Sequence, residues 1–256
     1  MTRFKVLFIS NLKRRIMDGF SVGYNILSPL LMIWLLGLLC KNMYQDELLT
    51  SYQYYGVVTI PFCIIMSIIT AAYAGKDDAF ANTADRILLA PVSDAEIVCA
   101  KILAEMIVFA GCSLLVLLVV NVFSNIGSYK ELGAIGLCYL SLSFVTACIG
   151  TFLGLGMKDF MKMKNILNIP VMIFAILGGC FYQFGTLNKP LQFVLNLSPL
   201  RWVNRSIFLL IYDKNCISFY RLNFVLIGIG GIFMLLAITC FKREEYGNGQ
   251  LPGYEK

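Results

Sequence analysis

The sequence predicts an all-α integral membrane protein with six transmembrane helices. Only 14% of its 256 residues are charged and 59% are hydrophobic, whereas a soluble domain carries about 25% charged residues. Six stretches without a charged residue are long enough to cross a membrane, and Lys and Arg gather in alternate connections between them. With so little charge the chain cannot cover its surface with groups that favour water, so lipid must cover it.

The predicted spans are defined by the charged residues that flank them. A helix needs about 20 residues to cross the hydrocarbon core, and each of the six uncharged intervals reaches that length. The remaining apolar segments are too short to span. We therefore expect one transmembrane domain, residues 1–256, with spans at residues 19–40, 48–75, 101–129, 132–157, 165–188 and 222–241.

The distribution of basic residues predicts the orientation. Six spans place both ends of the chain on one side, which then holds fourteen Lys and Arg, against seven on the other side. Because cytoplasmic connections carry the excess of Lys and Arg, we expect both termini in the cytoplasm and the protein in the cell (plasma) membrane. The net charge of +6 then reflects this topology, not a nucleic-acid partner.

The N-terminal segment, residues 1–18, has the pattern of an amphipathic helix. Apolar residues such as Phe4 and Leu7 recur at helical spacing, with Lys5 and Lys13 among the basic residues between them. Such a helix is typical of the interface of an anionic inner leaflet. The alternative is an ordinary charged flank that only sets the orientation.

The composition argues against an enzyme. The chain has no histidine, and its nine cysteines are scattered without metal-ligand spacing. Apart from Glu105 near one end, the uncharged cores of the spans hold no acid or base of the kind that proton- or sodium-coupled carriers keep at mid-membrane. No Lys is followed by Ser or Thr, so a GxxxxGK[ST] phosphate loop is absent. We expect no catalytic residue, no metal and no cofactor bound by this chain.

The cytoplasmic loop, residues 76–100, is long and contains helix signals of its own. Ser93 followed by Glu96 forms a capping box, and Pro91 stands just before it. This pattern predicts a short helix at residues 83–89, a break at Pro91, and a helix that continues into the third span. On that helix Lys101 and Glu105, four residues apart, are predicted to pair. A rigid projection of this kind suits docking onto a partner.

The predicted extracellular segment, residues 189–221, is the longest connection. It mixes apolar runs with Arg201, Trp202 and Arg205. One interpretation is an aromatic anchor with arginines that extend to the interface. The other is a gate or a contact for anionic groups of a lipid or substrate.

Small residues and prolines mark points of close packing and bending. Gly150 and Gly154 have the spacing that lets helices approach closely, either within the chain or at a seam between two copies. Pro29, Pro61 and Pro170 are predicted to bend three of the spans.

Two short motifs resemble one family of membrane proteins. The stretch RILLAPVS at residues 86–93, followed by IVCAKIL at residues 97–103, is similar to the R-x-L-x-x-P-V-S…K-x-L segment of ABC type-2 permeases. The stretch LSPLRW at residues 197–202 resembles the L-S-P-x-x-W element ahead of the last span in that family. Six spans with cytoplasmic ends fit as well, so the resemblance covers nearly the whole chain.

The resemblance implies roles for particular segments. The N-terminal helix, with Lys5 and Lys13, would be a connecting helix that contacts an ATPase, and residues 81–90 would be the coupling helix inserted into that ATPase. Residues 191–212 would form re-entrant helices that cap the pathway. The first, second and fifth spans would line the dimer interface and the substrate route. The residues concerned are, for coupling, Lys5, Lys13, Arg86, Ile87, Leu88, Leu89 and Pro91; for the pathway, Asn25, Phe181 and Gln183; and for the re-entrant element, Ser198, Pro199, Arg201, Trp202 and Arg205.

The expected function is therefore the membrane subunit of an ATP-driven exporter of an amphipathic or hydrophobic substrate such as a drug, antimicrobial peptide or natural product. Its partners would be an ABC ATPase that holds ATP and magnesium, a second permease copy or a sister permease, and lipid, but no nucleic acid. A polysaccharide or lipid-linked glycan exporter of the same family is the alternative. A membrane scaffold or regulatory protein is the alternative from another class.

Overall fold

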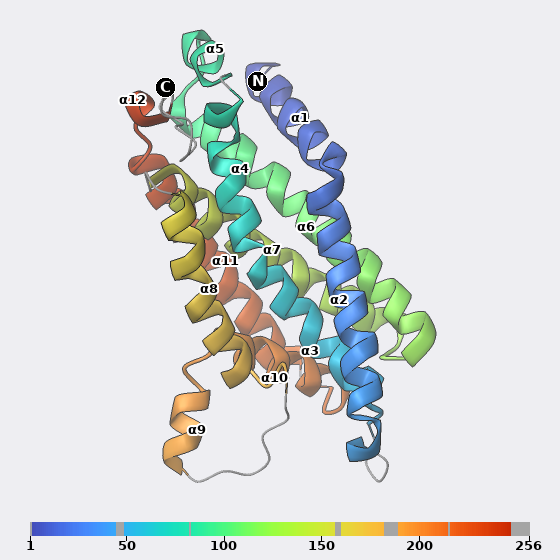
Figure 1. The fold of residues 1–256 in the computed structure, drawn as a ribbon. Coiled ribbons are helices and arrows are strands. Elements are labelled where there is room, and N and C mark those ends of the chain that lie inside the picture. Colours follow the sequence, from blue (N-terminus) through green and yellow to red (C-terminus); the bar gives the residue numbers. More distant parts are fainter. Residues whose placement is uncertain are drawn as a thin grey trace.

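The computed structural model describes residues 2–44, 49–81, 83–156, 160–181, 189–214 and 216–246, and all regular elements in these ranges are helical (Figure 1). This confirms the predicted all-α class. The helices are α1 (Thr2–Met17), α2 (Gly19–Leu39), the 3₁₀ helix η1 (Lys41–Tyr44), α3 (Ser51–Met66), α4 (Ile68–Phe80), α5 (Ala84–Leu89), α6 (Asp94–Ser124), α7 (Tyr129–Gly156), α8 (Phe160–Leu177), α9 (Lys189–Leu195), α10 (Pro199–Ile211), α11 (Cys216–Thr239) and α12 (Arg243–Tyr246).

Among the described residues, five helical stretches are long and apolar enough to cross a membrane: Gly19–Leu39, Ser51–Asp78, Asp94–Ser124, Tyr129–Gly156 and Cys216–Thr239. The fifth predicted span corresponds to α8, whose apolar part is the shorter stretch Asn165–Leu177. The rest of that predicted span includes residues 182–188, which lie outside the described residues, so the count of six stays a prediction.

Several helices begin before the predicted spans do. α6 begins at Asp94 instead of residue 101, and α11 begins at Cys216 instead of residue 222. The flanking charges mark where a helix leaves the hydrocarbon, but the backbone hydrogen bonds of a helix continue past that point.

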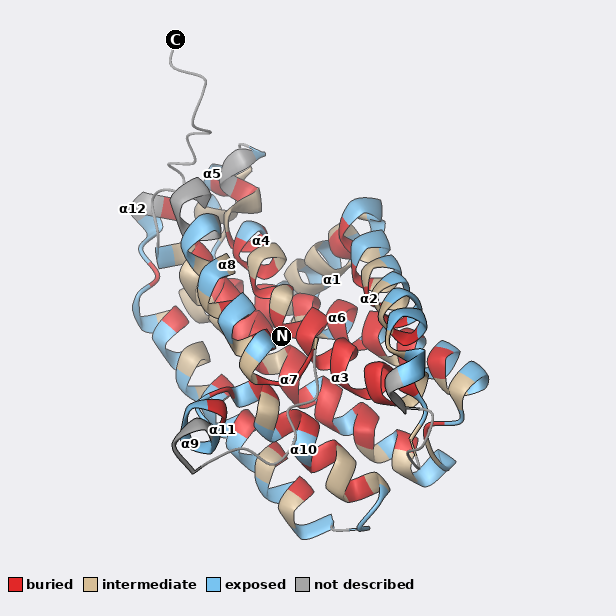
Figure 2. Ribbon diagram, turned by 60° about the horizontal axis from the view of Figure 1, so that its bottom comes forward, coloured by how far each residue is buried: buried red, intermediate tan, exposed pale blue. Residues whose placement is uncertain are grey.

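A turn at Ser67 divides the second span into α3 and α4. The Ser67 hydroxyl contacts two groups, the carbonyl of Cys63 in the preceding turn at 2.9 Å and Asn25 Oδ1 of α2 at 2.5 Å. Figure 2 shows that α3 and α7 are largely buried at the centre of the bundle, whereas α2 and α8 carry many exposed residues. The second span is therefore the core of the bundle, and its break is held by α2.

α4 and α7 approach closely at two glycines. A Cβ atom on Gly150 would lie 2.8 Å from the carbonyl oxygen of Ile68, and one on Gly154 would overlap the backbone of Ala72. Both glycines are therefore used for packing within the chain, which is the first of the two interpretations left open by the sequence.

The bundle has two distinct ends (Figure 1). The start of α1, the short helix α5 and α12 lie together at one, which we call the α5 end. η1, α9 and α10 lie at the other, which we call the α10 end. The charged side chains described below lie in two groups, one near each end.

Candidate functional site

The α5 end is organised by the turn between α4 and α5. The backbone N–H of Thr83 donates to the carbonyl of Asp78 at 2.9 Å, and α5 starts at the next residue. Ala90 is extended, as expected for a residue before proline, and Pro91 prevents the helix from continuing. Ser93 and Glu96 then form the predicted capping box at the start of α6. The predicted order of short helix, break and capped helix is confirmed.

α5 has an exposed face and a packed face. Leu89 is 87% exposed and Arg86 is also exposed at the tip of the projection. Ile87 and Leu88 are half-buried against an apolar cluster that includes Phe241. The four coupling residues predicted on α5 therefore divide into two that a partner can reach and two that attach α5 to the bundle.

Both terminal segments of the chain hold the loop that follows α5. The Arg3 guanidinium of α1 donates to the carbonyl of Pro91 at 2.7 Å. Arg243 of α12 lies 2.5 Å from the Asp94 carboxylate and donates to the carbonyl of Val92 at 2.9 Å. Segments from opposite ends of the sequence thus meet on residues 91–94, an arrangement that the sequence did not predict.

A fully buried carboxylate, Asp78, lies below this loop. It accepts from Lys101 Nζ of α6 at 2.6 Å, from Arg14 of α1 at 2.7 Å, and from the Tyr246 hydroxyl of α12 at 2.6 Å. Burial and the neighbouring carboxylate raise the pKa of Tyr246 well above its usual value, so its hydroxyl stays protonated and remains a donor. Asp78 therefore joins α4 to three other helices.

Arg15 extends the same group of charges. Its Nε lies 2.6 Å from the buried carboxylate of Glu105, and it donates to Asp77 at 2.9 Å. Three basic and three acidic side chains thus balance each other. We call them the ionic cluster, which consists of Arg14, Arg15, Asp77, Asp78, Lys101 and Glu105.

The predicted pair between Lys101 and Glu105 is wrong. Each residue pairs instead with a neighbouring helix, Lys101 with Asp78 and Glu105 with Arg15. Lys101 also donates to the carbonyls of Ala74 and Gly75 at 3.2 and 3.0 Å. A buried charge needs several partners in good geometry, which one residue a turn away cannot supply. Two pairs of adjacent charges could have signalled these partners: Arg14 and Arg15 before the first span, and Asp77 and Asp78 after the second.

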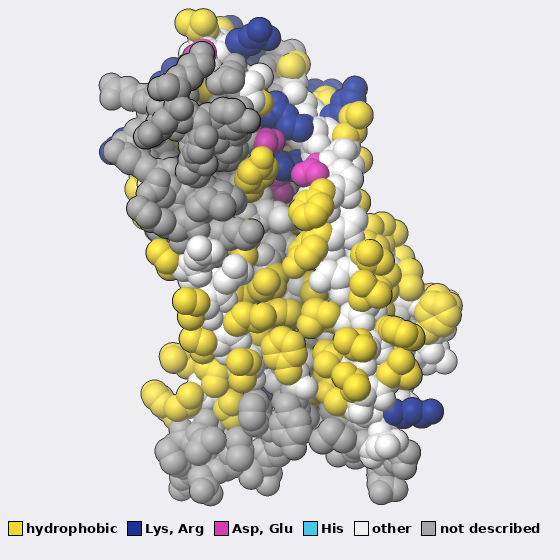
Figure 3. All heavy atoms as spheres, viewed as in Figure 1, with side chains coloured by type: hydrophobic (Ala, Val, Ile, Leu, Met, Phe, Trp, Pro, Cys, Tyr) yellow, Lys and Arg dark blue, Asp and Glu magenta, His cyan; other side chains and the backbone are white. Residues whose placement is uncertain are grey.

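A groove of about 620 Å³ lies beside the ionic cluster, between the α1–α2 junction and α4. One part of its lining is apolar or aromatic and the other is charged. Figure 3 shows the charged side chains next to one another near the α5 end, above a broad area of hydrophobic side chains. The lining residues are Arg14, Arg15, Asp18, Phe20, Ser21, Ile69, Thr70, Tyr73 and Asp77.

Lys5, Lys13 and Asn25, which were predicted for coupling and for the pathway, are not members of this cluster. Lys5 and Lys13 are exposed on α1. Asn25 is buried and donates to the carbonyl of Ser21 at 2.9 Å, besides its contact with Ser67, so it holds α2 to the α3–α4 turn. The position of Asn25 gives it a packing role, and its contact with a substrate stays a prediction.

Two aromatic or polar residues were also predicted for the pathway. Phe181 is half-buried, and its ring packs on that of Phe62 with the centroids 5.7 Å apart. Its carbonyl accepts from the Tyr55 hydroxyl at 3.1 Å. Gln183 lies outside the described residues.

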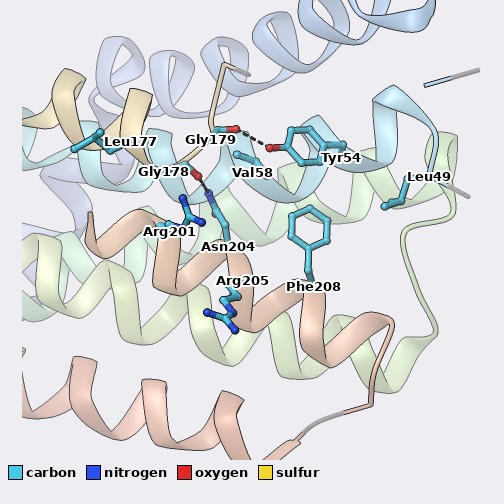
Figure 4. A pocket seen from close by; sticks show the side chains of 10 residues that line it. All are labelled: Leu49, Tyr54, Val58, Leu177, Gly178, Gly179, Arg201, Asn204, Arg205 and Phe208. Carbon is cyan, nitrogen blue, oxygen red and sulfur yellow. Dashed lines mark hydrogen bonds between the residues drawn. The ribbon is translucent and has the colours of Figure 1, made fainter. Parts of the chain in front are cut away.

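The α10 end carries the second sequence motif. Ser198 precedes α10, but its hydroxyl donates to the carbonyl of Phe174 at 2.7 Å instead of capping the helix. Pro199 is the first residue of α10, and Trp202 is half-exposed. A pocket of about 250 Å³ lies between α10, α3 and the end of α8 (Figure 4), with Arg201 and Arg205 in its lining. The predicted helices are present, and re-entry into the membrane stays a prediction.

A family model described as ABC-2 type transporter matches residues 2–212, which run from α1 through the end of α10. The chain belongs to the ABC-2 type transporter family. The chain is therefore a multi-pass membrane permease of an ABC transporter, a family whose members work with an ABC ATPase. No curated protein matches the chain closely enough to count as a relative. The α5 projection, the ionic cluster and the α10 pocket lie within the matched residues, except for the contacts that α12 contributes.

Proposed function

We propose that this ABC-2 permease is the membrane subunit of an exporter for an amphipathic or hydrophobic substrate, driven by a separate ATPase that docks at the α5 end. The substrate class is that of a drug, an antimicrobial peptide or a natural product. The polysaccharide exporter is the less favoured member of the same family, because the groove beside the ionic cluster combines apolar and charged walls.

The observation that carries the proposal is the contrast between the tip and the base of α5. At the tip, Arg86 and Leu89 are exposed and available to a partner. At the base, Thr83 binds Asp78, and Asp78 binds α1, α6 and α12. Removing one partner of a buried ion pair costs about 3–5 kcal/mol, so these helices are expected to follow a displacement of α5 together.

The arrangement of the ends supports six spans. α1 and α12 both lie at the α5 end (Figure 1), which requires an even number of crossings between them. Five long helices supply an odd number, so α8 is proposed as the remaining crossing. The excess of Lys and Arg on this side supports a cytoplasmic position for the α5 end and for both termini.

A second subunit is proposed on the face that carries the groove. α2 presents large apolar side chains there and along its length, including Phe20, Leu27 and Trp34, which are 81%, 59% and 59% exposed. Either a second copy of this chain or a sister permease fits this face, and the two would enclose the substrate route between them.

The test of the proposed docking is the variant Leu89→Asp. A carboxylate at the exposed tip should abolish co-purification of the ATPase without unfolding the permease, since Leu89 has few contacts within the chain. The matched control is Leu197→Asp, which changes a leucine that is 68% exposed at the other end. The proposal fails if both variants retain the ATPase equally, or if both lose it.

A further inference from the structure

One wall of the pocket at the α10 end is formed by backbone directly after α8. Gly179 has a φ of 76°, which reverses the chain directly after α8. The carbonyl of Gly178 accepts from Asn204 Nδ2 at 3.1 Å, and that of Gly179 accepts from the Tyr54 hydroxyl at 2.8 Å. Figure 4 shows these contacts at the wall that faces α10. These contacts hold the chain after α8 in position at this wall of the pocket.

The polar groups of the pocket have unused binding capacity. Arg201 is half-buried and Arg205 is exposed one turn further along α10, and neither guanidinium has an ion pair within the described part of the chain. Asn204 is 4% exposed and its Oδ1 atom is buried, so its amide holds the wall through Gly178 and does not face a ligand. The lining thus presents two cations that have no acidic partner among the described residues.

The apolar side of the pocket matches a lipid. Its lining includes Leu177, Val58 and Phe208. Trp202 lies half-exposed on α10, the helix that carries Phe208. Aromatic residues concentrate at the level of the lipid headgroups, where guanidinium groups can bind phosphate through two parallel hydrogen bonds.

We propose that this pocket binds the phosphate ester of an anionic membrane lipid, for which phosphatidylglycerol is the probe. The arginines contact the phosphate, and the acyl chains follow the apolar wall. If the orientation proposed above holds, this lipid belongs to the outer leaflet. The binding itself does not depend on that orientation.

Trp202 provides the reporter for the test. The chain has two tryptophans, Trp34 and Trp202, so a Trp34→Phe background isolates the signal beside the pocket. The protein is placed in nanodiscs of phosphatidylcholine with an increasing share of brominated phosphatidylglycerol, and quenching of Trp202 is measured. Brominated phosphatidylcholine in unbrominated phosphatidylcholine gives the reference for a lipid without net charge.

In the Trp34→Phe background, half-maximal quenching is expected at a share of phosphatidylglycerol about tenfold lower than after the further change Arg201→Gln. A tenfold difference corresponds to the loss of one charge-assisted contact. Arg221→Gln, which changes an exposed arginine at the start of α11, should leave the preference intact. Equal emission of all variants without brominated lipid shows that the fold is retained. The proposal is overturned if the two brominated lipids quench equally, or if Arg201→Gln keeps the preference.

A second arm identifies the source of the phosphate. Glycerol 1-phosphate at millimolar concentration should not reverse the quenching, because it lacks the acyl chains that the apolar wall requires. If this soluble ester displaces the brominated lipid, the site binds a free phosphate compound and the assignment to a lipid is overturned.

Discussion

The two ends of this permease use charge in opposite ways. At the α5 end, Arg15, Asp78, Lys101 and Glu105 are buried and paired across three helices, α1, α4 and α6. At the α10 end, the ion pair between Lys214 and Glu131 is at the surface, and the pocket arginines have no acidic partner in the described residues. Paired charges transmit a displacement between helices, whereas unpaired charges are available to a ligand. Under the proposed function, the α5 end with its paired charges receives the force of the ATPase, and the α10 end with its unpaired arginines meets the membrane surface or the substrate.

The largest expected effect comes from breaking the ionic cluster at its centre. Asp78→Asn removes the carboxylate charge that contacts both Lys101 and Arg14, and a buried cation left without its partner costs about 3–5 kcal/mol. The matched change at the other end is Glu131→Gln, whose surface pair is worth at most about 1 kcal/mol. Apparent Tm in detergent should fall strongly for the first variant and little for the second. Equal shifts of Tm in the two variants would contradict the proposed difference between the two ends.

A smaller effect is expected within a single helix, α7. Gly154→Ala places a methyl group against the backbone of Ala72 near the α5 end, and overpacking of this kind costs about 1–3 kcal/mol. Gly133→Ala, toward the α10 end of the same helix, points into open space and should be neutral or slightly stabilising. Thermal unfolding of the two variants measures the difference. A destabilised Gly133→Ala with an unaffected Gly154→Ala would contradict the packing of α4 on α7.

Local rules in the sequence predicted much of this fold. The capping box of Ser93 and Glu96 and the break at Pro91 depend on residues within one or two turns, so they could be predicted correctly. The long spans could be predicted because the membrane imposes their length and composition. The partners of Lys101 and Glu105 could not, because α4 and α1 supply them from distant positions: Asp78 is 23 residues from Lys101, and Arg15 is 90 residues from Glu105.

The α10 pocket shows the same limit. The sequence singled out Arg201 and Arg205 but gave no sign of Gly178, Gly179 or Tyr54, which close the pocket from other helices. The contacts of Arg3 and Arg243 with the loop after α5 join the two ends of the chain, and no local pattern encodes them. Contacts between distant segments appear only when the helices are packed.

The central claim is that the ionic cluster passes movement of α5 to the opposite end of the spans. The most direct test uses spin labels at Leu39→Cys and Leu197→Cys, both exposed at the α10 end, with the exposed Cys216 and Cys240 replaced by Ser. The distance between the labels is measured in the complex with the ATPase, before and after trapping with ATP and vanadate. The comparison is made with the double variant Arg15→Gln and Glu105→Gln, which removes both members of a pair and so leaves neither charge of that pair buried alone. The account predicts a distance change on trapping that is lost in the double variant while the ATPase stays bound. A change of the same size in both proteins would contradict it.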